Sequence, residues 1–221
     1  RVGLKVPSVE DVAQLLITRN GIEPGLARSA AAEAQSHIGM ALRLATSAEA
    51  RARRKEVLQS ALSITTVTAA VKTSDRWLEL AKKDAEQMSA ERDGKEKSDL
   101  LASMGLTDKD TVPPALRSEI KRLEDAQKRR NTRSERDGLD RVLVDLLALY
   151  RDVLSVQLRA EVDLVNEDLA DQIREVAAQT KPADSIHKLE AIEQARARIA
   201  RNVRDQLVLD SLAVSLQIRK V

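Results

Sequence analysis

Residues 139–158 carry apolar side chains on almost every face of a helix. An ordinary surface helix buries about a third of its circumference and is polar elsewhere. A helix that is apolar all round has to be enclosed by other elements, so we predict a central, buried helix here. Its apolar positions are Leu139, Val142, Leu143, Leu146, Leu147, Leu149, Val153 and Leu154.

The composition of the whole chain also favours helices. The 221 residues are 43% hydrophobic and 33% charged, with seven Gly, five Pro and only two aromatic residues, Trp77 and Tyr150. Ala, Leu, Arg, Glu and Lys dominate, as is typical of long helices. We therefore predict an all-α fold of one or two domains.

Several classes of function are excluded by what the sequence lacks. Without cysteine there is no disulfide, no thiolate metal site and no catalytic thiol. No apolar run reaches the roughly 18 residues of a membrane span. The phosphate-binding motifs G-x-x-x-x-G-K-[ST] and G-x-G-x-x-G are missing, and His37 and His187 stand in no zinc-binding pattern. We expect no cofactor, no metal and no catalytic residues in this chain.

Turn and capping signals divide the chain into three parts. Residues 1–7 alternate loosely, like the end of a strand, and Ser8 with an acid three residues later is typical of a helix start. Three short helices fit within 8–46, and we predict that they form a small bundle. Residues 47–221 are predicted to form a larger helical domain.

The larger domain contains a long helical hairpin. Ser47 is the predicted cap of its first helix, and a longer helix over 63–93 should end at Gly94. A mostly polar helix over 114–141 returns and leads into the central helix. Two further helices are expected over 166–180 and 184–201, before the last stretch of the chain.

The last stretch, residues 202–219, is apolar on more than one face of a helix. Two interpretations remain open, because such a helix belongs either to the core of one domain or to a contact between subunits. The candidate interface residues are Val203, Leu207, Leu209, Leu212 and Leu216.

A basic tract lies at 117–136, with eight Lys or Arg against four acids. The net charge of the chain is only +2, so any contact with nucleic acid has to come from such a local patch. No aromatic residue interleaves, which excludes base stacking. The candidate DNA contacts are Lys128, Arg129, Arg130 and Arg133; the alternative is a solvated helical tip.

Three segments of the C-terminal half together resemble a known family. They are LLALYRDVLSVQL at 146–158, LVNEDLADQIREVA at 164–177 and IHKLEAIEQARARIARNVRDQLVLDSLAVSL at 186–216. In this order they are similar to the C-terminal collar domain of bacterial clamp-loader subunits, in particular the delta-prime family of DNA polymerase III. The matching elements are Tyr150-Arg151-Asp152, Asn166 to Leu169 and the helix that begins at Asn202.

The N-terminal part fits the same resemblance. Residues 1–7 are similar to the last strand of an AAA+ core, and 8–46 to its three-helix lid. ATP-binding relatives often carry a Gly-x-x-Arg element in the lid. Counted from Gly39, that position here is Leu42, and an apolar side chain cannot pair with phosphate. This departure favours delta-prime over the gamma/tau ATPase subunits.

The resemblance implies a non-catalytic, cytoplasmic protein. Such a subunit joins delta and gamma/tau subunits in a hetero-pentamer that places the sliding clamp on primed DNA, without contact with a membrane. The collar, here 47–221, would be its oligomerisation domain. Two alternatives remain: a gamma/tau-type ATPase fragment, and a helical scaffold with a DNA-contacting basic hairpin.

Overall fold

The computed structural model describes residues 6–107, 113–114 and 117–218. All secondary structure in these ranges is helical, which confirms the all-α fold. The predicted strand end at 1–7 falls mostly outside the described residues.

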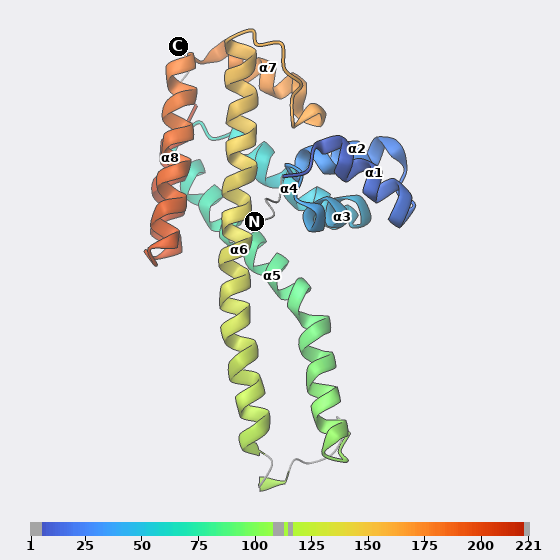
Figure 1. Ribbon diagram of the computed structural model, residues 1–221. Coiled ribbons are helices and arrows are strands. Elements are labelled where there is room, and N and C mark those ends of the chain that lie inside the picture. Colours follow the sequence, from blue (N-terminus) through green and yellow to red (C-terminus); the bar gives the residue numbers. More distant parts are fainter. Residues whose placement is uncertain (1–5, 108–112, 115–116, 219–221) are drawn as a thin grey trace, which may run out of the picture. The chain divides into compact units, whose positions relative to one another are not determined.

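The helices form two compact units, shown along the chain in Figure 1. Unit 1 combines Arg1–Asp75 with Val142–Val221, and unit 2 consists of Arg76–Arg141. Two long helices, α5 (Val67–Ser103) and α6 (Arg117–Gln157), contribute residues to both units. The chain therefore enters and leaves unit 2 within helices.

Unit 1 begins with three short helices, α1 (Val9–Asn20), α2 (Pro24–Glu33) and α3 (Ile38–Thr46). The predicted cap at Ser8 is confirmed, because its side chain accepts a hydrogen bond from the Asp11 backbone N–H and Asp11 accepts one from the Ser8 N–H. Alanines fill much of their shared core and let the helices approach closely. The fully buried residues of this core include Ala13, Ala27, Ala31 and Ala41.

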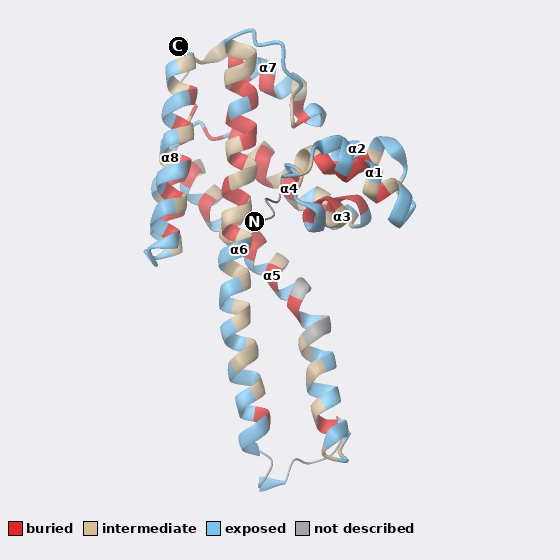
Figure 2. Ribbon diagram, viewed as in Figure 1, coloured by how far each residue is buried: buried red, intermediate tan, exposed pale blue. Residues whose placement is uncertain are grey.

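The rest of unit 1 surrounds the C-terminal half of α6. The helices are α4 (Ala48–Leu62), the short 3-10 helix η2 (Glu167–Leu169), α7 (Ala170–Gln179), α8 (Pro182–Ala200) and α9 (Asp205–Ser215). The Ser47 cap of α4 is confirmed by its hydrogen bond from the Ala50 N–H. The central helix is confirmed too: Leu143, Leu146 and Leu149 are fully buried, and Figure 2 shows buried residues on successive turns of this part of α6.

Unit 2 is an antiparallel hairpin of α5 and α6 residues. From its base towards its tip, Ala81 approaches Gly138, Asp93 approaches Gln127, and Lys97 pairs with Glu124. The prediction that the first arm ends at Gly94 is wrong, because α5 continues to Ser103. A glycine costs a helix interior only about 1 kcal/mol relative to alanine, and contacts of Asp93 and Lys97 with α6 hold the helix on both sides of it.

The two helical glycines of this hairpin should respond oppositely to alanine. A Cβ at exposed Gly94 would meet nothing within 4 Å, so Gly94→Ala should raise the free energy of unfolding by about 0.5–1 kcal/mol. A Cβ at Gly138 would lie 3.2 Å from the Ala81 carbonyl oxygen. Because of this close contact, Gly138→Ala should not raise the free energy of unfolding as Gly94→Ala does. Urea unfolding of the two variants measures the difference, and an equal gain in both would contradict the close approach.

Candidate functional site

A buried arginine in α4 joins three parts of unit 1. The side chain of Arg54 is 7% exposed, and its Nε donates to Asp145 Oδ1 of α6 at 3.1 Å. Its second terminal nitrogen donates to Asn166 Oδ1 at 2.6 Å, and the first lies 3.3 Å from Glu33 Oε2 of α2. One guanidinium thus links the three-helix bundle to the central helix and to the segment before η2.

A buried carboxylate continues this network. Asp152, 1% exposed, accepts hydrogen bonds from the Val165 N–H (3.2 Å), the Asn166 N–H (2.9 Å) and the Asn166 side-chain amide (2.8 Å). Asn166 is fully buried, and its amide connects Asp152 with Arg54. The two sequence elements around Asp152 and Asn166, each noted for its resemblance to the clamp-loader family, therefore meet in one hydrogen-bonded network. We call this network the buried polar joint; its members are Glu33, Arg54, Asp145, Asp152 and Asn166.

Sequence reasoning missed Arg54 and Glu33 as members of this joint. The available signal is Asp145, which interrupts an otherwise apolar run in the central helix. A carboxylate in such a position has to be paired when it is buried. The sequence does not show which of the many arginines supplies the charge, because 91 residues separate Arg54 from Asp145.

Tyr150, the first member of the Tyr150-Arg151-Asp152 element, faces α8. Tyr150 is fully buried, its hydroxyl donates to the Ala61 carbonyl at 3.4 Å, and burial raises its pKa. Lys188 Nζ lies 5.0 Å from the centre of the Tyr150 ring. Burial lowers the pKa of Lys188 to about 8, and the charge of Asp184 opposes this shift in part. The ring face, in turn, attracts the ammonium form.

Replacing Lys188 with methionine should stabilise the protein more at neutral than at alkaline pH. Because the pKa falls from 10.5 to about 8 on folding, the protonated amine costs stability below pH 8, and this cost disappears as the pH rises from 8 to 10.5. The advantage of Lys188→Met over the natural chain should shrink by about 2 kcal/mol between about pH 7 and pH 10. Urea unfolding at both pH values measures it, with Lys72→Met, on exposed α5 surface, as the control. A pH-independent difference would show that the Tyr150 ring fully offsets the burial.

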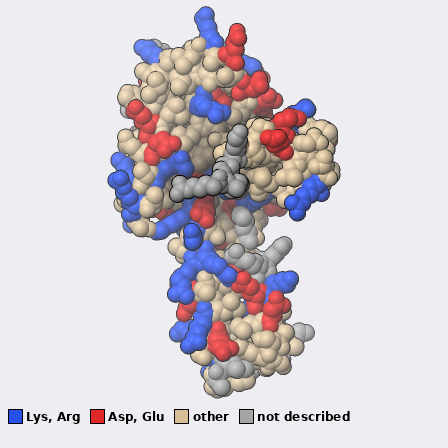
Figure 3. Space-filling view, in the orientation of Figure 1, with Lys and Arg blue, Asp and Glu red and all other residues tan. Residues whose placement is uncertain are grey.

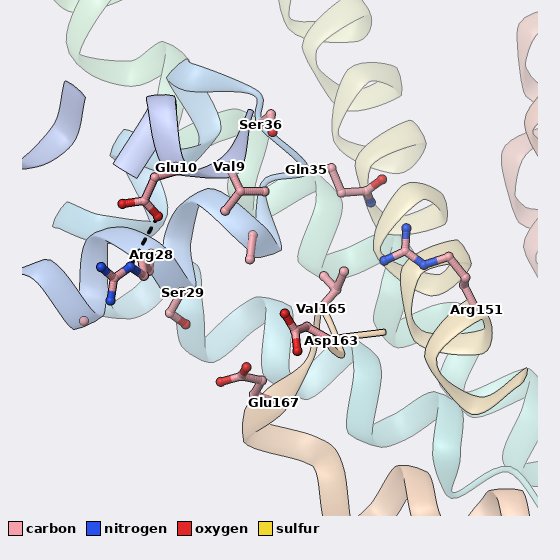
Figure 4. Close-up of a pocket in the computed structure, with 12 residues that line it drawn as sticks. Val9, Glu10, Arg28, Ser29, Gln35, Ser36, Arg151, Asp163, Val165 and Glu167 are labelled. Carbon is pink, nitrogen blue, oxygen red and sulfur yellow. Dashed lines mark hydrogen bonds and ion pairs between the residues drawn. The ribbon is translucent and has the colours of Figure 1, made fainter. Parts of the chain in front are cut away.

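A cleft of about 720 Å³ lies beside the buried polar joint (Figure 4). Arg28 and Ser29 of α2 line one side, and Arg151, Asp163 and Glu167 line the other. Arg28 is paired with Glu10 at 3.4 Å, as the dashed line shows. Charges of both signs line the cleft, so its residues favour no single class of ligand.

The last helix, α9, begins at Asp205 and not at Asn202 as predicted, so Val203 lies before it. The candidate interface residues fall into a buried and an exposed group. Leu209, Leu212 and Leu216 are at most 2% exposed and belong to the core of unit 1. They cannot contact another subunit while this core is intact. Val203 and Leu207 are 41% and 59% exposed, respectively, and remain available for a contact.

The candidate DNA contacts also divide into two groups: Arg130 is ion-paired within the hairpin, and the other three are exposed. Arg130 is half-buried against the other arm of the hairpin, where it pairs with Asp93 at 3.4 Å and with Glu96. Lys128, Arg129 and Arg133 are exposed and form no ion pair with any residue that the structure describes. Arg130 therefore stabilises the hairpin, whereas the other three are free to meet a ligand.

Two kinds of feature are absent from the described residues. None of the helices in these ranges is long and apolar enough to cross a membrane. No group of His, Asp and Glu side chains there is arranged to hold a metal ion.

The fold and these sites define an all-α protein in which a three-helix bundle precedes a larger helical body with a hairpin. Over 72 residues, 33% of the chain, the sequence is 35% identical to the DNA polymerase III subunit delta' of Bacillus subtilis (strain 168). The match covers 22% of that relative, so it spans about a fifth of the relative's length. No family model matches the chain, and no solved structure matches it. The similarity supports a relation to DNA polymerase III subunits of this kind.

Proposed function

We propose that this chain is the lid and collar portion of a non-catalytic, delta-prime-type clamp-loader subunit. In this proposal residues 8–46 are the lid and 47–221 the collar. Together with delta and gamma/tau subunits they form the hetero-pentamer that places the sliding clamp on primed DNA in the cytoplasm. The observation that carries the proposal is the 35% identity over 72 residues to a delta' subunit.

The position of Leu42 favours this proposal over a gamma/tau-type ATPase. Leu42 is half-buried and packs against the core of the three-helix bundle. It replaces the arginine that ATP-binding relatives often place over the nucleotide. A side chain that takes part in bundle packing supports a structural role for this lid.

The proposal assigns exposed Leu207 of α9, together with Val203 just before this helix, to a contact between subunits. Leu207 lies in the first turn of α9, and Val203 lies in the segment just before that helix; both side chains are exposed. Leu207 is one of the most exposed large apolar side chains of the described residues. Such a residue suits the apolar centre of an obligate interface.

Light scattering after size-exclusion chromatography tests the proposed function. We expect the chain to run in a complex of defined mass when it is mixed with purified delta and gamma/tau clamp-loader subunits. The same chain alone gives the reference mass. A natural full-length protein that stays at its own mass with every one of these partners would contradict the proposal.

A further inference from the structure

The outer surface of the hairpin carries a row of arginines along α6. Arg122, Arg129 and Arg133 are spaced by seven and four residues, so they share one face of the helix over about 16 Å. All three are exposed, and Lys121 and Lys128 flank them. Figure 3 shows Lys and Arg side chains gathered along one side of the hairpin. We call these five residues the arginine row.

The hairpin satisfies its internal charges without using this row. Arg130 pairs with Asp93 and Glu96, and Lys97 pairs with Glu124 at 3.1 Å, all between the two arms. No member of the row forms an ion pair within the described chain. Asp125, also exposed, is the acid that lies three residues after Arg122. Glu119, three residues before Arg122, and Asp137, four residues after Arg133, are further exposed acids within about one turn of the row. Among the described residues none of these acids forms an ion pair with the row, and the row takes no part in the ion pairs between the arms.

The chemistry of the surrounding surface favours phosphate over protein. The centres of protein interfaces are enriched in apolar and aromatic side chains. Among the described residues of unit 2, no large hydrophobic side chain is exposed. A guanidinium presents a planar fork of donors that matches a phosphate, and spaced arginines can contact successive phosphates of a backbone.

The aromatic residues indicate which form of nucleic acid fits. Sequence-tolerant binding of single strands relies on bases that stack on aromatic side chains. The chain has one Trp, one Tyr and no Phe, and both Trp77 and Tyr150 are fully buried. We propose that the arginine row binds the phosphate backbone of a duplex nucleic acid, without reading its bases.

Fluorescence anisotropy with the whole chain and a labelled DNA duplex of about 20 base pairs tests this inference. With three phosphate contacts, the affinity should fall roughly 40-fold between about 50 and 200 mM salt. The triple variant Arg122→Gln/Arg129→Gln/Arg133→Gln should lose most of this salt dependence and bind at least roughly ten times more weakly at the lower salt. Removing one neighbouring acid, in Asp125→Asn, should strengthen binding.

The control variant has the same net charge with the changes placed elsewhere. Arg28→Gln/Arg174→Gln/Arg196→Gln removes three arginines of unit 1 that are paired with acids, and it should bind like the natural chain. Circular dichroism checks that both triple variants remain helical. Equal binding of an RNA duplex would show that the phosphate backbone alone is recognised, and weaker binding would restrict the ligand to DNA.

Four results would overturn the inference. They are no binding to either duplex at the lower salt, equal losses in the two triple variants, tighter binding of a single strand than of the duplex, and tighter binding of a poly-glutamate peptide. The test uses the chain without other subunits, so its result is independent of the proposed assembly.

Discussion

Replacing Arg54 with methionine should lower the free energy of unfolding by about 3–5 kcal/mol. Methionine retains much of the volume but removes the only cation of the buried polar joint. Glu33 and Asp145, both largely buried, would then lose the guanidinium that pairs with them, and Asn166 Oδ1 would lose its donor. Urea unfolding followed by circular dichroism measures the loss.

Two further variants separate the buried charge from the loss of packing. Arg28→Met breaks the ion pair with Glu10, both of whose side chains are about two thirds exposed, and should cost less than about 1 kcal/mol. Arg54→Met/Glu33→Gln/Asp145→Asn removes the charges of both carboxylates as well and should recover part of the stability. A loss below about 1 kcal/mol in Arg54→Met would contradict the role of the joint.

Leu209→Asp should unfold unit 1, whereas Leu207→Asp should leave it folded. Leu209 is fully buried, so aspartate there both opens a cavity and buries a charge, at a cost of more than about 4 kcal/mol. Leu207, two residues earlier in the same helix, is 59% exposed, and its replacement should change stability by no more than about 0.5 kcal/mol. Far-UV circular dichroism and urea unfolding distinguish these outcomes.

The same pair of variants tests the proposed interface. Under the proposed function, Leu207→Asp should keep its helicity and fail to form the complex with delta and gamma/tau subunits. A folded Leu207→Asp chain that assembles normally would remove Leu207 from the interface. Unfolding of Leu207→Asp would show instead that this side chain is part of the core.

Local signals predicted local structure well. Ser8 and Ser47 were identifiable as caps because each bonds a backbone N–H only three residues away. The central helix was identifiable because its apolar residues occupy almost every face, and the structure buries most of them. The predicted helix end at Gly94 was wrong because a single glycine is a weak stop signal when contacts across the hairpin outweigh its cost.

Signals that depend on distant residues could not be resolved from one sequence. Arg129 and Arg130 are neighbours of the same type, yet only Arg130 finds its acid partners, 34 and 37 residues away on α5. Leu207 and Leu209 likewise look equivalent in a helix that is apolar on several faces. Which of them is covered depends on the elements that pack around α9, and these come from far along the chain.

The interrupted sequence of unit 1 has a consequence for synthesis on the ribosome. The three-helix bundle and the hairpin are each continuous in sequence, so each can fold soon after it leaves the exit tunnel. The large core of unit 1 has to wait, because Leu58 and Ile64 are made long before Leu209 and Leu216. At about 5–20 residues per second, residues 142–221 take on the order of ten seconds to make. During that interval the apolar side of α4 is uncovered, which makes the nascent chain a candidate client for chaperones.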